Sequence, residues 1–181
     1  MQHSEACNDG PGVYCSFRKV GAILPKYAIM LANQTTSTAT KTILGAYMLT
    51  DNTRHGEIVE VICTGSGSAA AADIQTRCDL AGCTFGATGA STTITPIPFN
   101  PNAGAATGNY GTNYSTEPTS YSAVHPVTFG FNQRGGMRWA VPQGEGFKIA
   151  NAGTTEKGAG ITTIASAAGN ADATMHFWQG N

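Results

Sequence analysis

Histidine is the residue type in this chain with the broadest chemistry, since imidazole binds metal ions and transfers protons near neutral pH. The four histidines are scattered, at His3, His55, His125 and His176. They show no HxH or HExxH spacing, whereas a catalytic metal site on a β scaffold needs histidines clustered with a glutamate on adjoining strands. We therefore predict no metal ion and no cofactor.

Three short segments approximate catalytic or binding motifs, but each lacks a part. Gly65-Ser66-Gly67-Ser68-Ala69 is close to the turn that presents a catalytic serine, yet the final glycine and the following helix are missing. The polar residues after Asp51-Asn52 match no calcium-loop spacing. Gly135-Gly136 has neither the lysine nor the helix of a phosphate loop, so we expect a bulge or a close backbone approach there. We predict no enzymatic activity.

Five cysteines lie at Cys7, Cys15, Cys63, Cys78 and Cys83. The first residues lack the basic and then apolar regions of a secretory signal, so we expect synthesis in a cytosol. The odd count and this location favour free thiols. Two disulfides remain open if the protein later meets oxidising surroundings, Cys7 with Cys15 and Cys78 with Cys83. Zinc is not expected, because no CxxC pair occurs.

A set of aromatic residues is expected to be exposed and to form a contact surface. Tyr and Trp are enriched at protein interfaces, and exposed rings also stack on sugars. A protein interface is the favoured interpretation, and the sugar-binding surface of a lectin is the alternative. The candidates are Tyr110, Tyr114, Tyr121, His176 and Trp178.

The chain is poor in charge. Charged residues make up 12% of it, against about 25% for an ordinary soluble domain, and Glu117 is the only formal charge between Asp79 and Arg134. The net charge of −1 gives no reason to expect binding to nucleic acid or to an anionic membrane, and no segment has the ~20 consecutive apolar residues of a membrane span. Two classes remain: a secreted, Thr/Gly-rich β protein, or a subunit whose surface lies against other subunits, which we favour.

The clearest structural signal lies in residues 133–151. Met137, Trp139 and Val141 alternate with Arg138 and Ala140, the period of two expected of a strand with one buried face. Proline and glycines make the segment 142–146 a turn, after which residues 147–149 resume the alternation. This pattern predicts a β-hairpin whose apolar face, led by Trp139 and Phe147, lies in the core.

The chain as a whole predicts eight to ten short strands, the two of this hairpin included, and no sustained helical period. Residues 1–25 are expected to form an extended N-terminal arm, and residues 26–181 a single domain. Residues 84–120 form a long Gly/Thr/Asn-rich loop, in which Pro96 and Pro98 exclude a central strand. The predicted fold class is all-β, a single antiparallel β-sandwich of jelly-roll type. Further predicted strands are Tyr27–Leu31, Thr42–Leu49, Glu57–Cys63, Val124–Phe131, Ile161–Ala165 and Ala173–Gln179. In the last of these, Met175 and Phe177 alternate with His176 and Trp178.

The order of these segments resembles that of small virion proteins of tailed phages. A strand and Thr/Ala-rich loop at Tyr27–Leu49 precede a strand at Glu57–Cys63 and a variable Gly/Thr-rich middle. The segment Arg134-Gly135-Gly136-Met137-Arg138-Trp139-Ala140-Val141-Pro142 then leads through Gly144-Glu145-Gly146-Phe147 to a last aromatic strand, Met175-His176-Phe177-Trp178. The resemblance covers roughly residues 26–181, and the Arg-Gly-Gly…Trp…Pro…Gly segment is its most specific part.

This resemblance implies a jelly-roll subunit on the capsid surface, often a trimer, that decorates or cements the shell by binding the major capsid protein. Another structural position on the virion, such as a head fibre base, the neck or the tail, is an alternative. A lectin-like module is the alternative from a different class. Because jelly rolls also include lectins and enzymes, the fold by itself does not decide among these functions.

Overall fold

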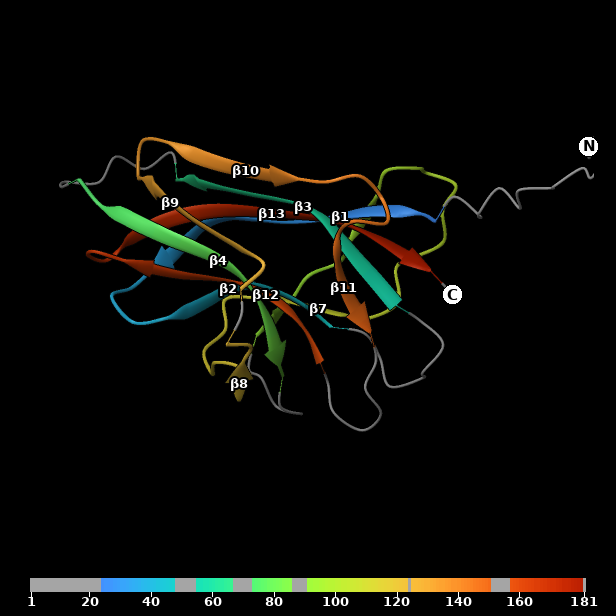
Figure 1. Ribbon diagram of the computed structural model, residues 1–181, viewed down its shortest axis with the longest axis horizontal. Helices are drawn as coiled ribbons and strands as arrows, with labels where there is room; N and C mark the ends of the chain where they lie inside the picture. Colours follow the sequence, from blue (N-terminus) through green and yellow to red (C-terminus); the bar gives the residue numbers. More distant parts are fainter. Residues whose placement is uncertain are drawn as a thin grey trace, which may run out of the picture.

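The computed structural model describes residues 24–47, 55–66, 73–85, 91–123, 125–150 and 157–180. Every regular element in these ranges is a β-strand, and this part of the chain contains no helix with the length and apolarity needed to cross a membrane. The strands form two antiparallel sheets packed one on the other (Figure 1). The predicted all-β sandwich is therefore confirmed. Residues 1–23, most of the predicted arm, lie outside the described ranges.

Sheet A has six strands and sheet B has seven. In sheet A the order is β10 (Gly136–Ala140), β3 (His55–Gly65), β13 (Gly169–Gly180), β1 (Lys26–Thr36) and β6 (Ile97–Pro98), and β11 (Phe147–Ala150) also pairs with β3. In sheet B the order is β5 (Thr92–Thr93), β7 (Asn109–Thr112), β2 (Lys41–Tyr47), β12 (Lys157–Ala165), β4 (Gln75–Thr84) and β8 (Ser120–Tyr121), and β9 (Val127–Asn132) also pairs with β4. As Pro96 and Pro98 required, β6 is a two-residue edge strand.

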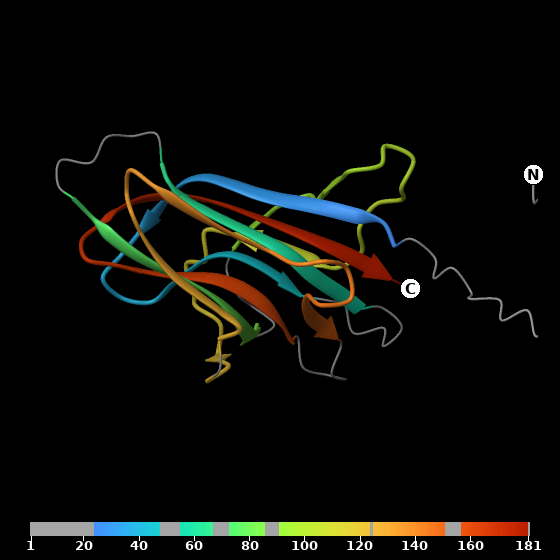
Figure 2. The ribbon, with the colours of Figure 1, turned by 45° about the horizontal axis from the view of Figure 1, so that its top comes forward.

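The long strands pair in a nested order. β1 pairs with β13, β2 with β12, β3 with β10 and β11, and β4 with β9. The chain thus follows one long hairpin, closed between β4 and β9, whose successive pairs alternate between sheet A and sheet B. In Figures 1 and 2, β9 leads out of the lower layer into β10 of the upper layer. This nesting places β13 inside sheet A, between β1 and β3.

The last strand, β13, shows how the sequence produces the core. Its side chains alternate strictly between the two faces of sheet A, as predicted. Met175 and Phe177 point between the sheets and are fully buried, while His176 and Trp178 point outward. Phe177 stacks on Tyr27 of β1 with ring centroids 5.5 Å apart, and on Tyr110 of β7 with centroids 5.2 Å apart. Since β7 belongs to sheet B, these three rings tie the two layers together.

The predicted hairpin at residues 133–151 is wrong in its pairing. β10 and β11 do not pair with each other; both pair with β3, one after the other along the same edge. Residues 142–146 therefore form a loop that interrupts the edge strand. The chain departs from β3 after β10 and pairs with β3 again at β11, in the same direction. Trp139 and Phe147 do pack against the core, as predicted, whereas Met137 is 43% exposed at the edge of the sheet.

The break between β10 and β11 coincides with a bulge in β3. His176 of β13 lies opposite Glu60 and the next residue, Phe177, lies opposite Ile58, so Val59 has no partner on β13. One extra residue reverses the alternation of a strand. Glu57 and Glu60, three positions apart, consequently point to the same outer face of sheet A.

A row of residues with minimal side chains crosses sheet B. Each is the cross-strand partner of the next, from β7 through β2 and β12 to β4. They are Gly111, Gly45, Gly160 and Ala81. The rings of Tyr114 and Phe85, with centroids 5.6 Å apart, lie over Gly45, and the Tyr114 hydroxyl also lies over Gly111. Tyr114 is 2% exposed as a result. Its predicted exposure is wrong, because the glycines leave room for its ring against the sheet.

The predicted close approach at Gly135-Gly136 is confirmed. The Gly65 amide donates a hydrogen bond to the Gly135 carbonyl oxygen at 3.0 Å. A methyl group on Gly136 would overlap the Thr64 side chain, and one on Gly65 would overlap the Gln133 carbonyl. The two backbones meet here at a distance that admits only glycine.

We predict that Gly45→Ala lowers the free energy of unfolding by about 1–3 kcal/mol, because the added methyl group overpacks a buried site. That methyl group would lie 2.9 Å from Phe85 Cε1 and would overlap the Tyr114 hydroxyl. The matched control is Gly130→Ala on β9, where the nearest atom would be the Thr76 carbonyl oxygen at 3.8 Å. The control should stay within about 0.5 kcal/mol of wild type. Urea unfolding measures both, and equal losses would contradict the packing of Tyr114 described above.

Candidate interaction surface

Glu60 lies at the centre of a charged cluster on the outer face of sheet A. Arg138 Nε donates to its Oε1 at 2.5 Å, His176 Nδ1 lies 2.6 Å from its Oε2, and Lys26 Nζ lies 3.8 Å away. The Glu60 side chain is only 10% exposed. Burial alone would raise its pKa, but the hydrogen bonds from Arg138 and His176 outweigh burial and hold the pKa below 4.5. Glu60 is therefore a buried carboxylate that its partners keep ionised.

Glu57 anchors the protruding segment 142–146. Its Oε1 accepts hydrogen bonds from the amides of Gly144 and Gly146, each at 2.7 Å, and Lys148 Nζ lies 2.9 Å from Oε2. Burial would raise the Glu57 pKa, and these partners lower it below 4.5. Gly144 has φ of +101°, which favours glycine. One buried carboxylate thus fixes the loop where the edge strand is interrupted.

Aromatic and cationic groups lie beside the Glu60 cluster. The Phe99 ring meets the His176 ring edge-on, with centroids 4.9 Å apart, and Lys26 Nζ lies 4.8 Å from the Phe99 centroid. A groove of about 480 Å³ adjoins them, and Leu24, Pro25, Phe99 and Trp178 are among its lining residues. We call it the Trp178 groove.

Three large apolar side chains are exposed along the same margin of sheet A. Ile97 lies opposite Ala28 in the β1–β6 pair, so it shares the outer face with Met30. Exposed fractions are 53% for Met30, 56% for Ile97 and 54% for Phe99. We call these three residues the apolar margin. In the described part of the chain, the fourth exposed large hydrophobic residue is Met137, on β10 at the opposite edge of sheet A.

The structure divides the five aromatic residues that were predicted to form one surface. His176 and Trp178 lie two residues apart on the outer face of sheet A, next to the apolar margin. Tyr110 is 4% exposed in the stack with Phe177, so its predicted exposure is wrong, as is that of Tyr114. Tyr121 is half-buried on sheet B, where it packs against the small cluster that includes Tyr114.

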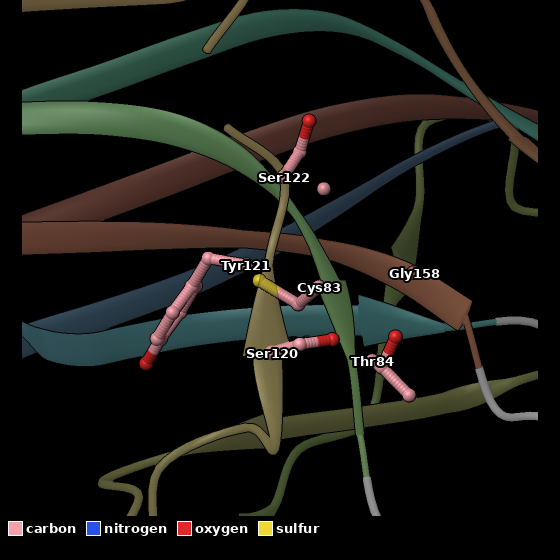
Figure 3. Close-up of a pocket in the computed structure, with 7 residues that line it drawn as sticks. Cys83, Thr84, Ser120, Tyr121, Ser122 and Gly158 are labelled. Carbon is pink, nitrogen blue, oxygen red and sulfur yellow. The ribbon is translucent and has the colours of Figure 1, made fainter. Parts of the chain in front are cut away.

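Tyr121 lines a second cavity, of about 270 Å³, beside the end of β4 (Figure 3). Its hydroxyl donates to Glu117 Oε2 at 2.6 Å, and the Thr42 amide donates to the same oxygen at 2.7 Å. Cys83 also lines this cavity, and burial raises the pKa of its thiol to about 12. A thiol that remains protonated near neutral pH is a poor nucleophile. The cavity therefore has polar hydroxyl groups but no activated cysteine.

The proposed Cys78–Cys83 disulfide does not form. Cys63, Cys78 and Cys83 are all free and buried. Cys78 and Cys83 are five residues apart on β4 and point to opposite faces, at a separation of roughly 16 Å along an extended strand, too far for a disulfide. Cys7 and Cys15 lie outside the described residues. Across the residues that the structure describes, no three His, Cys, Asp or Glu side chains are grouped to hold a metal ion.

Most of this surface was missed by the sequence analysis, including Lys26, Glu60 and the three residues of the apolar margin. The signal for Glu60 was present, because two glutamates three apart in the β-branched run 57–63 cannot share a face of a regular strand. That conflict predicts a bulge. For Phe99, the neighbouring prolines indicate an edge, but nothing in the sequence places its ring on His176.

We predict that Glu60→Gln weakens the dependence of stability on acid pH. Because the folded-state pKa of Glu60 lies below 4.5, its interactions stabilise the protein above about pH 4.5 and are lost as pH falls through the folded-state pKa. The variant should be about 1–3 kcal/mol less stable near neutral pH, and the difference should shrink in acid. Urea unfolding as a function of pH tests this. Glu145→Gln, on the exposed loop, controls for loss of one negative charge; an equal effect from it would refute the role given to Glu60.

Comparisons with known proteins assign this surface to no family. No model of a known protein family matches the chain, and no characterised protein or solved structure matches it. The function is therefore inferred from the fold and from the chemistry of the surface.

Proposed function

We propose that this chain is a non-enzymatic virion structural protein, a decoration (cement) protein on the capsid surface that binds the major capsid protein and stabilises the shell. The observation that carries the proposal is the apolar margin. Met30, Ile97 and Phe99 lie together on one border of sheet A, and each is more than half exposed. Exposed apolar side chains that gather on one face, unlike those scattered singly, are typical of interaction sites.

The strand order supports a jelly roll. The pairs β1–β13, β2–β12, β3–β10/β11 and β4–β9 are those of one hairpin wrapped into two sheets. This nesting supports the proposal of a jelly roll, a fold that capsid proteins and lectins share. The fold is therefore compatible with the resemblance to phage virion proteins. Because the fold does not distinguish a capsid protein from a lectin, the chemistry of the surface has to do so.

The chemistry of the margin suits a protein partner. Full burial of a Met, Ile or Phe side chain contributes about 1.5–3 kcal/mol, and the adjoining Lys26 and His176 provide a polar border to the apolar residues. Leu24 and Pro25 line the Trp178 groove, so the predicted arm joins the domain beside the same margin. In a homotrimer, the assembly that the resemblance implies, three such margins would bind far more tightly than one.

Copy number in purified virions tests the assignment. Quantitative mass spectrometry should find the chain in hundreds of copies, in a fixed ratio to the major capsid protein. Six or twelve copies would move the proposal to the neck or tail, and absence from the virion would overturn it.

Substitution of the margin tests the binding surface. The triple variant Met30→Ser, Ile97→Ser and Phe99→Ser should lose attachment to particles while it keeps its unfolding transition, since these side chains are exposed. Sedimentation of capsids made without the wild-type chain, mixed with purified variant, measures attachment. Met137→Ser, at the opposite edge of sheet A, is the matched control and should bind like wild type. Equal binding by the triple variant would exclude the margin as the contact.

A carbohydrate-binding function is the second candidate, and the Trp178 groove favours it. An indole beside the exposed Phe99 ring, with Asn100 at the groove wall, offers both stacking and hydrogen bonding to a sugar. We expect any glycan-array signal to disappear in Trp178→Ala and to survive in Met137→Ser. Array binding that persists in Trp178→Ala would exclude this groove as the sugar site.

A further inference from the structure

Two buried thiols meet across the interface between the sheets. Cys63 belongs to β3 of sheet A and Cys78 to β4 of sheet B. Both are completely buried, and their Sγ atoms are 2.7 Å apart. Each sulfur therefore has the other as its close partner on the facing sheet.

The surroundings leave the two sulfurs facing each other. Within sheet A, Cys63 lies between Ala173 and Met137; within sheet B, Cys78 lies opposite Phe129 on one side. The Sγ atoms are only about 0.7 Å farther apart than the atoms of a disulfide bond. A covalent bond would need a small movement of side chains and no change in the pairing of either strand.

We propose that Cys63 and Cys78 form a disulfide that joins sheet A to sheet B when the chain folds in the presence of a small-molecule disulfide. One cysteine thiolate attacks the small disulfide, forms a mixed disulfide and releases one thiol. The second thiolate attacks the mixed disulfide at the protein sulfur and releases the other thiol. The protein loses two hydrogens, and one disulfide molecule is reduced to two thiols. This modification is independent of the virion assignment.

Burial determines when the bond can form. Desolvation raises the pKa of Cys78 well above 9.0, and a protonated, buried thiol reacts slowly. The folded protein should therefore resist oxidation, while the folding or transiently opened chain should be oxidised. Cys83 cannot replace Cys78 as the partner of Cys63, because its side chain points to the other face of β4. Its thiol donates to the Ala81 carbonyl oxygen at 3.4 Å.

Peptide mapping after refolding tests the bond directly. The full chain carrying Cys7→Ser and Cys15→Ser is refolded with oxidised glutathione, alkylated, and digested with trypsin without reduction. Cleavage after Arg54, Arg77 and Arg134 separates Cys63, in the peptide 55–77, from Cys78, in the peptide 78–134. We expect these peptides to be linked, with a mass two hydrogens below their sum. Adding Cys83→Ser should leave the link intact, which assigns it to Cys78.

Thermal unfolding supplies a second measurement on the same protein. The bond closes a loop of about 15 residues, so the oxidised form should unfold about 6–12 °C above the same sample treated with dithiothreitol. The Cys63→Ala and Cys78→Ala double variant should show no response to dithiothreitol. Failure to find the linked peptides after refolding, with both thiols still titratable in the unfolded protein, would overturn the proposal whatever the stability of the variants.

Discussion

The bulge at Val59 is the constraint on which the outer face of sheet A depends. It turns both Glu57 and Glu60 to that face, although a regular strand would place them on opposite sides. Each carboxylate is nearly buried, and an unpartnered charge in such a position would be strongly destabilising. Glu57 is satisfied by loop amides and Lys148, and Glu60 by Arg138 and His176. The bulged residue Val59 therefore determines where the loop, the ion pairs and the aromatic groups beside them lie.

Local alternation located the longer predicted strands, but it missed β5, β6 and β7 inside the segment 84–120 that was predicted as a loop. The partners of the strands depended on distant residues. The pattern around Met175 and Phe177 assigned both faces of β13 correctly, because burial on one face imposes a period of two. The turn at 142–146 was recognised, yet its role was not: proline and glycine indicate a turn but not whether the chain reverses. Tyr110 and Tyr114 lie in the segment 84–120 that was predicted as a loop, and both were expected to be exposed. Their burial depends on Phe177 and on the glycine row, which belong to other parts of the chain.

Basic side chains on the outer face of sheet A form ion pairs with Glu57 and Glu60. Glu60 engages Lys26, Arg138 and His176, so its own negative charge is compensated and the cluster keeps a net positive charge from the two cations. What remains accessible beside it is apolar, at the margin and the groove. This division agrees with a chain in which charged residues make up 12%.

The central position of β13 has a consequence for biosynthesis. β1 and β3 emerge from the ribosome long before β13, yet each takes β13 as a neighbour in sheet A. Until Gly169–Gly180 has been made, both earlier strands present open hydrogen-bonding edges, which favour association between nascent chains. Sheet A can therefore be completed only after translation has passed the last described strand. Pairing between strands this far apart in the sequence is expected to make folding slow.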